Sequence, residues 1–521
     1  VKDKGSFIIS GRRTYADLVL RSLIRANIIR DTTLSDPRLY FYDFNAKANY
    51  RISDKDRIFL SGYFGRDVLG ITDFGFDWGN STATFRWNHL FSDKLFSNTS
   101  LVFNNFNYIL NNGSSSSPVN IVSKIRDFTV KQDYQYSSDK NNQIEFGFAS
   151  TFHRMVPGTI TGVDTNTVVK SLPINSSVEN SVYILHDYRF TSKLNVNYGL
   201  RISEFSLLGT APFYRYDSYN LVDSAKSIVD STMKVKSFIR FEPRMAISYV
   251  FNDENSIKAS YTRNVQYLHL LSNSTTGSPT DMWIPSSYNT IPETSDQYAF
   301  GYYRNFNDNN YEVSAEVYYK SLSHQVDYIK GAMLNFNANV ESQLIYGKGR
   351  AYGIELLLKK KYGRLSGWIG YTLSRSERRF GGINDGLWYP AKQDRTHDIS
   401  VVGVYELPKN WTISATWVYN TGNAVTFPKG AYLIDNRVVL LYTDRNGNRM
   451  PAYHRLDLGA TKQFRKRKNF ESNLTFSVYN AYSHDNAYTI TFNLNEDTKK
   501  IEAIQTTLFK LVPSITYNFK F

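Results

Sequence analysis

Apolar and polar residues alternate with a period of two along much of the chain. The C-terminal segment shows this most clearly, because Leu511, Pro513, Ile515, Tyr517, Phe519 and Phe521 fall on one face and polar residues fall mainly on the other. The segments NWTISATWVYN, KLNVNYGLRI and FEPRMAISYVF repeat the pattern. A strand with one apolar and one polar face is typical of a sheet that separates lipid from a water-filled interior. A soluble β-sandwich would alternate too, so the period alone leaves the fold open.

The spacing of the connections separates these two folds. Short polar turns recur as ISDKDR, FSDKLF, SSDKNN, FTSKLN, FNDENS and FNDNNY, followed by KKYGRL, ELPKNW and FRKRKN. Between them lie long connections rich in Ser, Asn, Gly and Thr, such as 154–180, 208–235, 264–295, 321–350 and 421–451. Short and long connections alternate strictly in this interpretation. The pattern predicts a transmembrane antiparallel β-barrel with short periplasmic turns and long extracellular loops.

The scheme gives about twenty strands of about 9–14 residues each, the length that a tilted strand needs to cross a bilayer. The expected strands begin near Ser6, Tyr40, Arg57, Thr82, Leu95, Lys124, Gln143, Ser181, Leu194, Phe238, Ser256, Gln297, Tyr311, Ala351, Leu365, Thr396, Trp411, Ala452, Glu471 and Leu511. One segment departs from the pattern. TYADLVLRSLIRANI, after Arg13, has its leucines at helical spacing and predicts a short helix in the first long loop.

Composition agrees with a membrane barrel. The 521 residues include no cysteine, which excludes disulfides and thiolate metal sites. No apolar run approaches the roughly 18 residues of a membrane-spanning helix. Aromatic residues make up 15% of the chain, as expected for strands and for aromatic girdles at the membrane interfaces. The net charge of +14 is scattered, and its densest cluster, RKRKN, lies in a predicted turn, so we expect contact with solvent or anionic lipid rather than nucleic acid.

Catalytic and metal-binding motifs are not found in the sequence. The eight histidines show no HExxH motif and no spacing typical of a metal site. A GxSxG elbow, a Walker-type loop and a GxGxxG motif are all missing from the sequence. We therefore expect no enzyme, no metal site and no cofactor, although a barrel-embedded lipase or protease remains conceivable.

Several segments carry a family resemblance. EVSAEVYYKSLSHQVDYI, GKGRAYGIELLLKKKYGRLSGWIGYTLSRSERRF, DRTHDISVVGVYEL and YHRLDLGATKQF resemble the C-terminal barrel of TonB-dependent outer-membrane receptors. The opening GSFIISGRRTYADL looks like an early barrel strand of the type often preceded by a carboxypeptidase-regulatory-like domain. The resemblance covers essentially the whole chain. Its most specific parts are GRAYGIEL, HRLDLG at 454–459, and Phe521, which looks like the family's barrel-assembly signal.

The resemblance implies a 22-stranded barrel closed around an N-terminal plug. We expect residues 1–521 to be the barrel without the plug and the first two strands. The implied activity is import of a scarce nutrient: loop capture, binding in the lumen, and release when the inner-membrane TonB complex pulls on the plug. The implied partners are this energy-coupling complex, outer-membrane lipids and the barrel-assembly machinery, and a surface lipoprotein is left open. The implied location is the outer membrane.

Candidate ligand-binding residues are aromatic or basic residues in the predicted loops, because flat rings stack on sugars, chelates or macrocycles. They are Tyr267, His269, Trp283, Arg378, Arg379, Trp388 and Tyr389. Packing between loops or a place in the outer girdle explains the aromatic residues and His269 equally well, and a solvated loop explains Arg378 and Arg379 equally well. Alternation places Arg455 and Asp457 on the lumen face, where they would line the barrel or contact the plug.

The sequence leaves other functions open. A passive porin, a structural or adhesive surface protein, and the barrel partner of a lipoprotein-capped glycan importer would show the same strand pattern. The substrate is also undetermined, because aromatic and arginine-bearing loops suit iron chelates, cobalamin, oligosaccharides and peptides alike.

Overall fold

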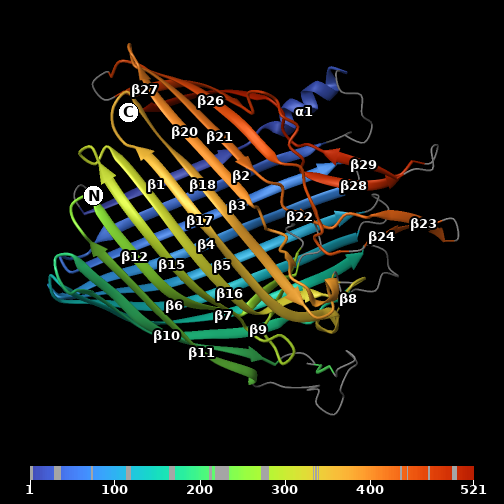
Figure 1. Cartoon of the computed structure of the whole chain (residues 1–521), viewed down its shortest axis with the longest axis horizontal. Coiled ribbons are helices and arrows are strands. Elements are labelled where there is room, and N and C mark those ends of the chain that lie inside the picture. The colour runs from blue at the N-terminus through green and yellow to red at the C-terminus, as the bar shows by residue number, and fades with distance from the viewer. Residues whose placement is uncertain are drawn as a thin grey trace.

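The computed structural model describes residues 4–27, 37–71, 74–112, 119–162, 170–209, 214–216, 234–271, 281–332, 334, 337, 339–434, 437–442, 444–466, 470–495 and 501–521. In Figure 1 the strands run obliquely and curl into a barrel-shaped wall, with short turns at one rim and long connections at the other. We call these the short-turn rim and the long-loop rim.

Twenty long strands form one antiparallel sheet. They are β1 (Gly5–Arg13), β2 (Arg38–Arg51), β3 (Asp56–Ile71), β4 (Phe74–Ser92), β5 (Leu95–Asn112), β6 (Val119–Asp139), β7 (Asn142–Gly162), β9 (Asn175–Arg189), β10 (Leu194–Leu208), β11 (Lys234–Val250), β12 (Asn255–Gln266), β15 (Glu293–Phe306), β16 (Tyr311–Tyr328), β17 (Leu344–Lys360), β18 (Leu365–Phe380), β20 (His397–Leu407), β21 (Trp411–Asn420), β26 (Tyr453–Gln463), β27 (Glu471–Tyr479) and β30 (Val512–Lys520).

Smaller elements lie at the long-loop rim. The two-residue strands β8 (Lys170–Ser171) and β19 (Tyr389–Pro390) extend the main sheet, and the described residues form four separate hairpins. The hairpins pair β13 (Leu268–Leu271) with β14 (Met282–Pro285), β22 (Ala424–Val425) with β25 (Asn448–Arg449), β23 (Gly430–Ile434) with β24 (Arg437–Leu441), and β28 (Thr489–Leu494) with β29 (Ile501–Thr506). Two short 3₁₀ helices, η2 (Val340–Gln343) and η3 (Asn384–Gly386), complete this rim.

Each long strand pairs with the next long strand along the chain, from β1–β2 to β27–β30. The strand number and the predicted short turns are therefore confirmed. The expected length of 9–14 residues is wrong for many strands, since β6 and β7 each have 21 residues. Their ladders continue past the lipid-facing level into the long-loop rim, because backbone pairing does not require apolar side chains. For the same reason β4 starts at Phe74 rather than near Thr82, and β17 at Leu344 rather than near Ala351.

The structure also tests two predictions about the connections between strands. Strict alternation of short and long connections fails between β3 and β4, because their ladder runs up to the pair of Ile71 and Phe74. The predicted first-loop helix is confirmed as α1 (Ala16–Arg25). Its Asp17 carboxylate is buried and lies 2.9 Å from the Arg13 guanidinium of β1, which fixes the helix beside the strand.

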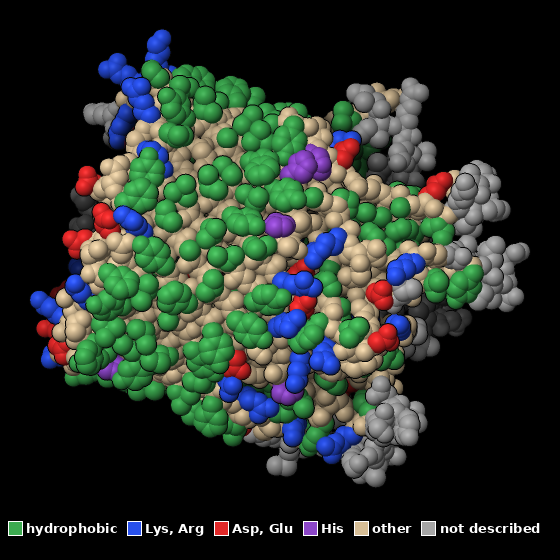
Figure 2. Space-filling view, in the orientation of Figure 1, with side chains coloured by type: hydrophobic (Ala, Val, Ile, Leu, Met, Phe, Trp, Pro, Cys, Tyr) green, Lys and Arg blue, Asp and Glu red, His purple; other side chains and the backbone are tan. Residues whose placement is uncertain are grey.

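The two faces of the sheet differ in polarity, as the sequence predicts. On β17, Ile354, Leu356 and Leu358 point to one side, where Val317 and Ile369 are their neighbours in register. Glu355 points to the other side. Figure 2 shows the outer side as a broad apolar wall. Such a wall around a polar interior belongs in lipid. None of the helices in the described residues is long and apolar enough to span a membrane.

The buried apolar core lies among the loops rather than inside the wall. One cluster joins Leu271 and Met282 of the β13–β14 hairpin to Val326 of β16 and Leu344 of β17. A second surrounds Phe205 of β10. These clusters pack the long connections onto the barrel, and they shape the long-loop rim into a defined surface.

Candidate ligand-binding cavity

A cavity of about 1790 Å³ lies at the long-loop rim. The ends of β16 and β18 and the hairpins β13–β14, β22–β25 and β23–β24 contribute to its lining. Its aromatic residues are Tyr328, Phe427, Tyr432, Tyr442 and Phe492. Its charged residues are the basic Lys330, Arg378, Lys392, Arg395 and Arg445 and the acidic Asp281, Glu293 and Asp327. The lining is therefore aromatic and carries more positive than negative groups.

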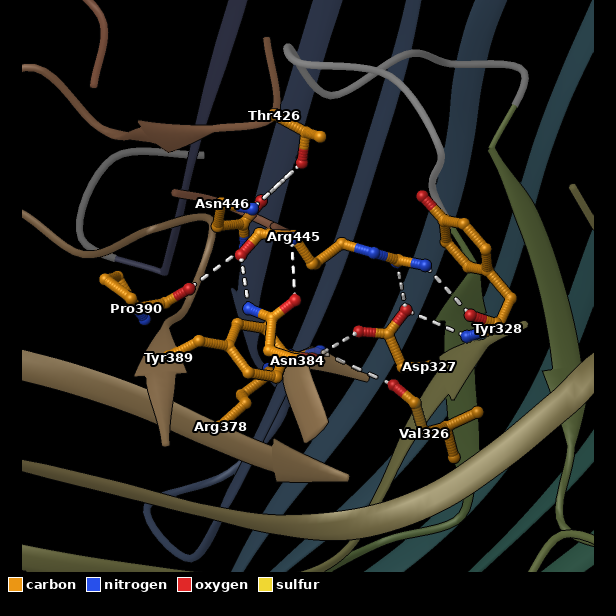
Figure 3. A network of polar contacts seen from close by, with 10 residues as sticks. All are labelled: Val326, Asp327, Tyr328, Arg378, Asn384, Tyr389, Pro390, Thr426, Arg445 and Asn446. Atoms are coloured by element: carbon orange, nitrogen blue, oxygen red, sulfur yellow. Dashed lines mark hydrogen bonds and ion pairs between the residues drawn. The ribbon is translucent and has the colours of Figure 1, made fainter. Parts of the chain in front are cut away.

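One ion pair holds the cavity wall together (Figure 3). The Arg445 Nη1 atom lies 2.6 Å from the Asp327 Oδ1 atom, and both side chains are largely buried. Arg445 also donates from Nη2 to the Tyr328 carbonyl oxygen at 2.9 Å, and its guanidinium lies 4.3 Å from the centroid of the Tyr328 ring. A charge-assisted hydrogen bond in a partly buried site is strong, so this contact anchors residues 444–449 against the end of β16.

Two asparagines continue the anchor on the loop side (Figure 3). The Arg445 backbone N–H donates to the Asn384 Oδ1 atom at 2.8 Å, and the Asn384 Nδ2 atom donates to the Arg445 carbonyl oxygen at 2.9 Å. The Asn446 backbone N–H donates to Thr426 Oγ1 at 2.9 Å, and its Nδ2 atom donates to the Pro390 carbonyl oxygen at 3.0 Å. The loop after β21 is thus tied to the loops that follow β16 and β18.

Tyr389 supports the same carboxylate. Its hydroxyl donates to the Asp327 Oδ2 atom at 3.1 Å, while its ring packs with Phe380 and Ile383. Burial, and secondly the charge of Asp327, raise the pKa of Tyr389. The phenol therefore keeps its proton and remains a hydrogen-bond donor. Arg445 therefore binds one oxygen of the Asp327 carboxylate and Tyr389 donates to the other, so both oxygens have partners.

His269 of β13 also lines the cavity. It is 2% exposed, its Nε2 atom lies 2.9 Å from Ser286 Oγ, and its Nδ1 atom lies 3.4 Å from Glu293 Oε1. Glu293 in turn accepts a hydrogen bond of 2.6 Å from Gln325 Nε2. Elsewhere in the lining, burial lowers the pKa of Lys392 in the loop before β20. A bound anion would offset that desolvation and favour the charged form of Lys392.

The structure brings three of the seven candidate loop residues to this cavity. His269 and Arg378 line it, and Tyr389 reaches it through Asp327. Arg378 also donates a long hydrogen bond of 3.4 Å to the Val326 carbonyl oxygen.

The other four candidates lie elsewhere. Tyr267 is buried, stacks on Phe205 at 5.0 Å and shares a hydrogen bond with Ser203. Trp283 lines a small separate crevice. Arg379 donates to the Gly386 carbonyl oxygen, and Trp388 lies under the guanidinium of Arg350 on the outer surface. Tyr267, Trp283 and Trp388 thus match the packing or girdle alternatives given for the aromatic candidates.

The predicted lumen residues form a closed set of contacts. Arg455 Nε lies 2.9 Å from Asp457 Oδ2, and Arg455 Nη1 donates to the hydroxyls of Tyr453 and Tyr479 at 2.8 and 2.9 Å. Phe521 follows β30 and stacks on Phe519, with 6.1 Å between ring centroids. Within the described part of the chain, no group of His, Asp and Glu side chains is placed to hold a metal ion.

Sequence reasoning missed Asp327, Tyr328 and Arg445. All three lie in connections that the sequence marks as long and polar. Their pairing joins residues 118 positions apart, for which no local pattern exists. An arginine within the 421–451 connection was the available signal, but nothing in the sequence distinguished it from its basic neighbours.

Comparison with known proteins identifies the family. The family model described as TonB dependent receptor-like, beta-barrel matches residues 22–481. No curated protein matches the sequence significantly.

Solved structures of similar fold include two uptake receptors and a copper transporter. The ferric yersiniabactin uptake receptor FyuA from Yersinia pestis is 14% identical with a TM-score of 0.65, covering 100% of this chain and 76% of its own. The ferric-catecholate import receptor Fiu from K12 E. coli is 12% identical with a TM-score of 0.62, covering 100% and 78%. The copper transporter OprC is 11% identical with a TM-score of 0.64, covering 99% and 76%. With its matching model and its twenty-stranded wall, the chain belongs to the TonB-dependent receptor β-barrel family of Gram-negative outer-membrane nutrient transporters.

Proposed function

We propose that the protein captures an anionic metal chelate in the long-loop cavity and passes it through the barrel in a TonB-energised step. The observation that carries this proposal is the cavity lining, in which the described residues include five basic and three acidic side chains with aromatic rings among them. Flat rings stack on the organic part of a chelate, while guanidinium groups bind its carboxylates or phenolates.

The acidic residues cancel only part of this charge. Asp327 pairs with Arg445, which leaves the basic Lys330, Arg378, Lys392 and Arg395 with the acidic Asp281 and Glu293 in the described lining. Glu293 accepts hydrogen bonds from Gln325 Nε2 and from the Val326 backbone N–H. Lys330 and Arg395, in contrast, are exposed at the lining. An anionic ligand would therefore meet basic groups that can still reach it. The cargoes named for the similar structures, ferric yersiniabactin, a ferric catecholate and copper, are consistent with a metal-bearing substrate.

Import of this kind needs parts beyond the wall described above. We propose that residues 1–521 act as the barrel domain, that a plug domain couples it to the TonB complex, and that Arg455 and Asp457 face that plug. Two further strands would fill the space between the edge strands β1 and β30. Phe521 would serve the barrel-assembly machinery, and the apolar wall would contact outer-membrane lipid. No catalytic step is required, and family and similar structures are transporters and receptors rather than enzymes.

Neutralising two cavity arginines is expected to weaken binding. Arg378→Gln combined with Arg395→Gln should lower the affinity for an anionic ferric chelate by about tenfold or more, since each removes a charge-assisted contact. Equilibrium binding of the purified receptor to a panel of ferric catecholates and uncharged oligosaccharides measures this.

Arg465→Gln is the matched control, because Arg465 is exposed in a turn at the opposite rim. It should bind as the native protein does. Preferential binding of an uncharged oligosaccharide, with an affinity that the double variant leaves unchanged, would contradict the proposal and favour a glycan importer.

A further inference from the structure

Four basic side chains gather on the outer surface of β17 and β18, beyond the apolar wall. We define the basic band as Lys348, Arg350, Arg375 and Arg379. Lys348 faces Arg379 across the two strands in an unbroken register. Strand alternation turns Lys348 to the same side as Leu356, so the basic band faces out of the barrel.

Tyrosines lie next to the end of the apolar run of β17 and on the strands beside it. Tyr261, Tyr298, Tyr319 and Tyr352 are successive cross-strand partners on β12, β15, β16 and β17. The cross-strand partner of Tyr352 on β18 is Arg375. Tyrosine rings concentrate at the boundary between hydrocarbon and headgroups. The basic band therefore begins at headgroup level, on the side of the long loops.

One carboxylate organises the two inner arginines. Glu377 Oε2 lies 2.7 Å from Arg350 Nη2, and Glu377 Oε1 lies 2.6 Å from Arg375 Nε. The Arg350 guanidinium also lies 4.3 Å from the centroid of the Trp388 ring. Two guanidinium groups share a single negative charge, and each has five N–H donors. One positive charge and several donors remain for an external anion.

The positive charges of the other two residues of the basic band are not neutralised by a carboxylate among the described residues. Lys348 and Arg379 are exposed, and among the described residues neither forms an ion pair. Arg379 donates one hydrogen bond of 2.8 Å, to the Gly386 carbonyl oxygen. Figure 2 shows Lys and Arg side chains concentrated on this face where the apolar wall gives way to the loops. The same surface thus carries an uncompensated positive charge directly next to apolar side chains.

We propose that the basic band binds the phosphate groups of an outer-leaflet lipid whose acyl chains lie along the wall below it. Ile354 and Leu373 are cross-strand partners one step below Tyr352 and Arg375, and Leu373 is exposed. Chains packed there would place their headgroup phosphates beside Arg375 and Lys348. Attraction of this kind between basic side chains and anionic headgroups is favourable for each charge involved. The proposal is independent of the cargo and of the cavity.

Titration of the detergent-solubilised protein with a bis-phosphorylated disaccharide lipid tests this site. The variant Lys348→Gln/Arg379→Gln is expected to bind the lipid about tenfold more weakly than the native protein. Neither residue is buried, so the thermal unfolding temperature should stay unchanged. The matched control is Lys193→Gln/Arg304→Gln, which removes two exposed basic residues near the short-turn rim and should retain native affinity.

Two comparisons identify the source of the phosphate. The dephosphorylated lipid should bind much more weakly than the phosphorylated one, and inorganic pyrophosphate should compete only at far higher concentration. Equal binding by native protein and the band variant would overturn the proposal. Competition by pyrophosphate at the same concentration as the lipid would overturn it as well, because the band would then be a site for a free anion.

Discussion

Replacing Leu356 by arginine is expected to lower the free energy of unfolding by about 2–4 kcal/mol, the cost of a basic side chain on the lipid face near the membrane midplane. Leu356 is the central member of the apolar run Ile354, Leu356 and Leu358 on the outer face of β17. An arginine there would have to reach a distant interface or carry water into the hydrocarbon. Equilibrium unfolding in lipid vesicles, followed by tryptophan fluorescence, measures the change.

The next residue provides the matched control. Glu355 is exposed on the lumen face of the same strand. Glu355→Arg introduces the same side chain one position away but into a polar interior, and it also removes a negative charge facing Glu316. Its unfolding free energy should change little. Similar losses at both positions would show that the assignment of lipid and lumen faces is wrong.

Removing the guanidinium of Arg445 is expected to detach its loop from the barrel. Arg445→Met leaves the buried Asp327 carboxylate without its ion-pair partner, at a cost of about 3 kcal/mol in local opening free energy. Amide hydrogen exchange at Asn446, whose N–H donates to Thr426 Oγ1, should then accelerate by about a hundredfold. Affinity for the cargo should fall as well, because the loop contributes aromatic residues to the cavity.

Lys429→Met is the control for this experiment. Lys429 pairs with Asp444 in the same loop at 3.3 Å, but both side chains are more than half exposed. Exposed pairs contribute little to stability, so exchange should change by less than about tenfold. If Arg445→Met exchanged no faster than Lys429→Met, the ion pair with Asp327 would not be what holds the loop.

The barrel could be predicted because its rules are local. Alternation along NWTISATWVYN and the short turn before it locate β21 without any tertiary information. The ends of strands at the long-loop rim were less predictable. There the ladder continues beyond the lipid-facing band, as it does from Phe74 to Thr82 in β4. Phe76 and Trp78 lie on the lumen face, opposite to the lipid-facing Phe85, and Phe76 packs against Tyr108.

The site was only partly predictable for the same reason. The sequence placed Arg378 and Arg379 together at a loop, yet β18 continues through Phe380. Alternation then sends Arg378 into the cavity and Arg379 to the outer surface. Tyr267 and Trp283 were selected as loop aromatics, and the structure packs the first against Phe205. Whether a loop aromatic is buried or available depends on contacts between distant loops, which residue type does not encode.

Uptake of a radiolabelled ferric catecholate by intact cells, with and without a functional TonB complex, separates the energised receptor from a passive channel. We expect uptake that saturates with concentration, requires TonB, and falls in the Arg378→Gln/Arg395→Gln variant but not in Arg465→Gln. Uptake that rises in proportion to concentration, persists without TonB and ignores the cavity variant would contradict energised import through this cavity.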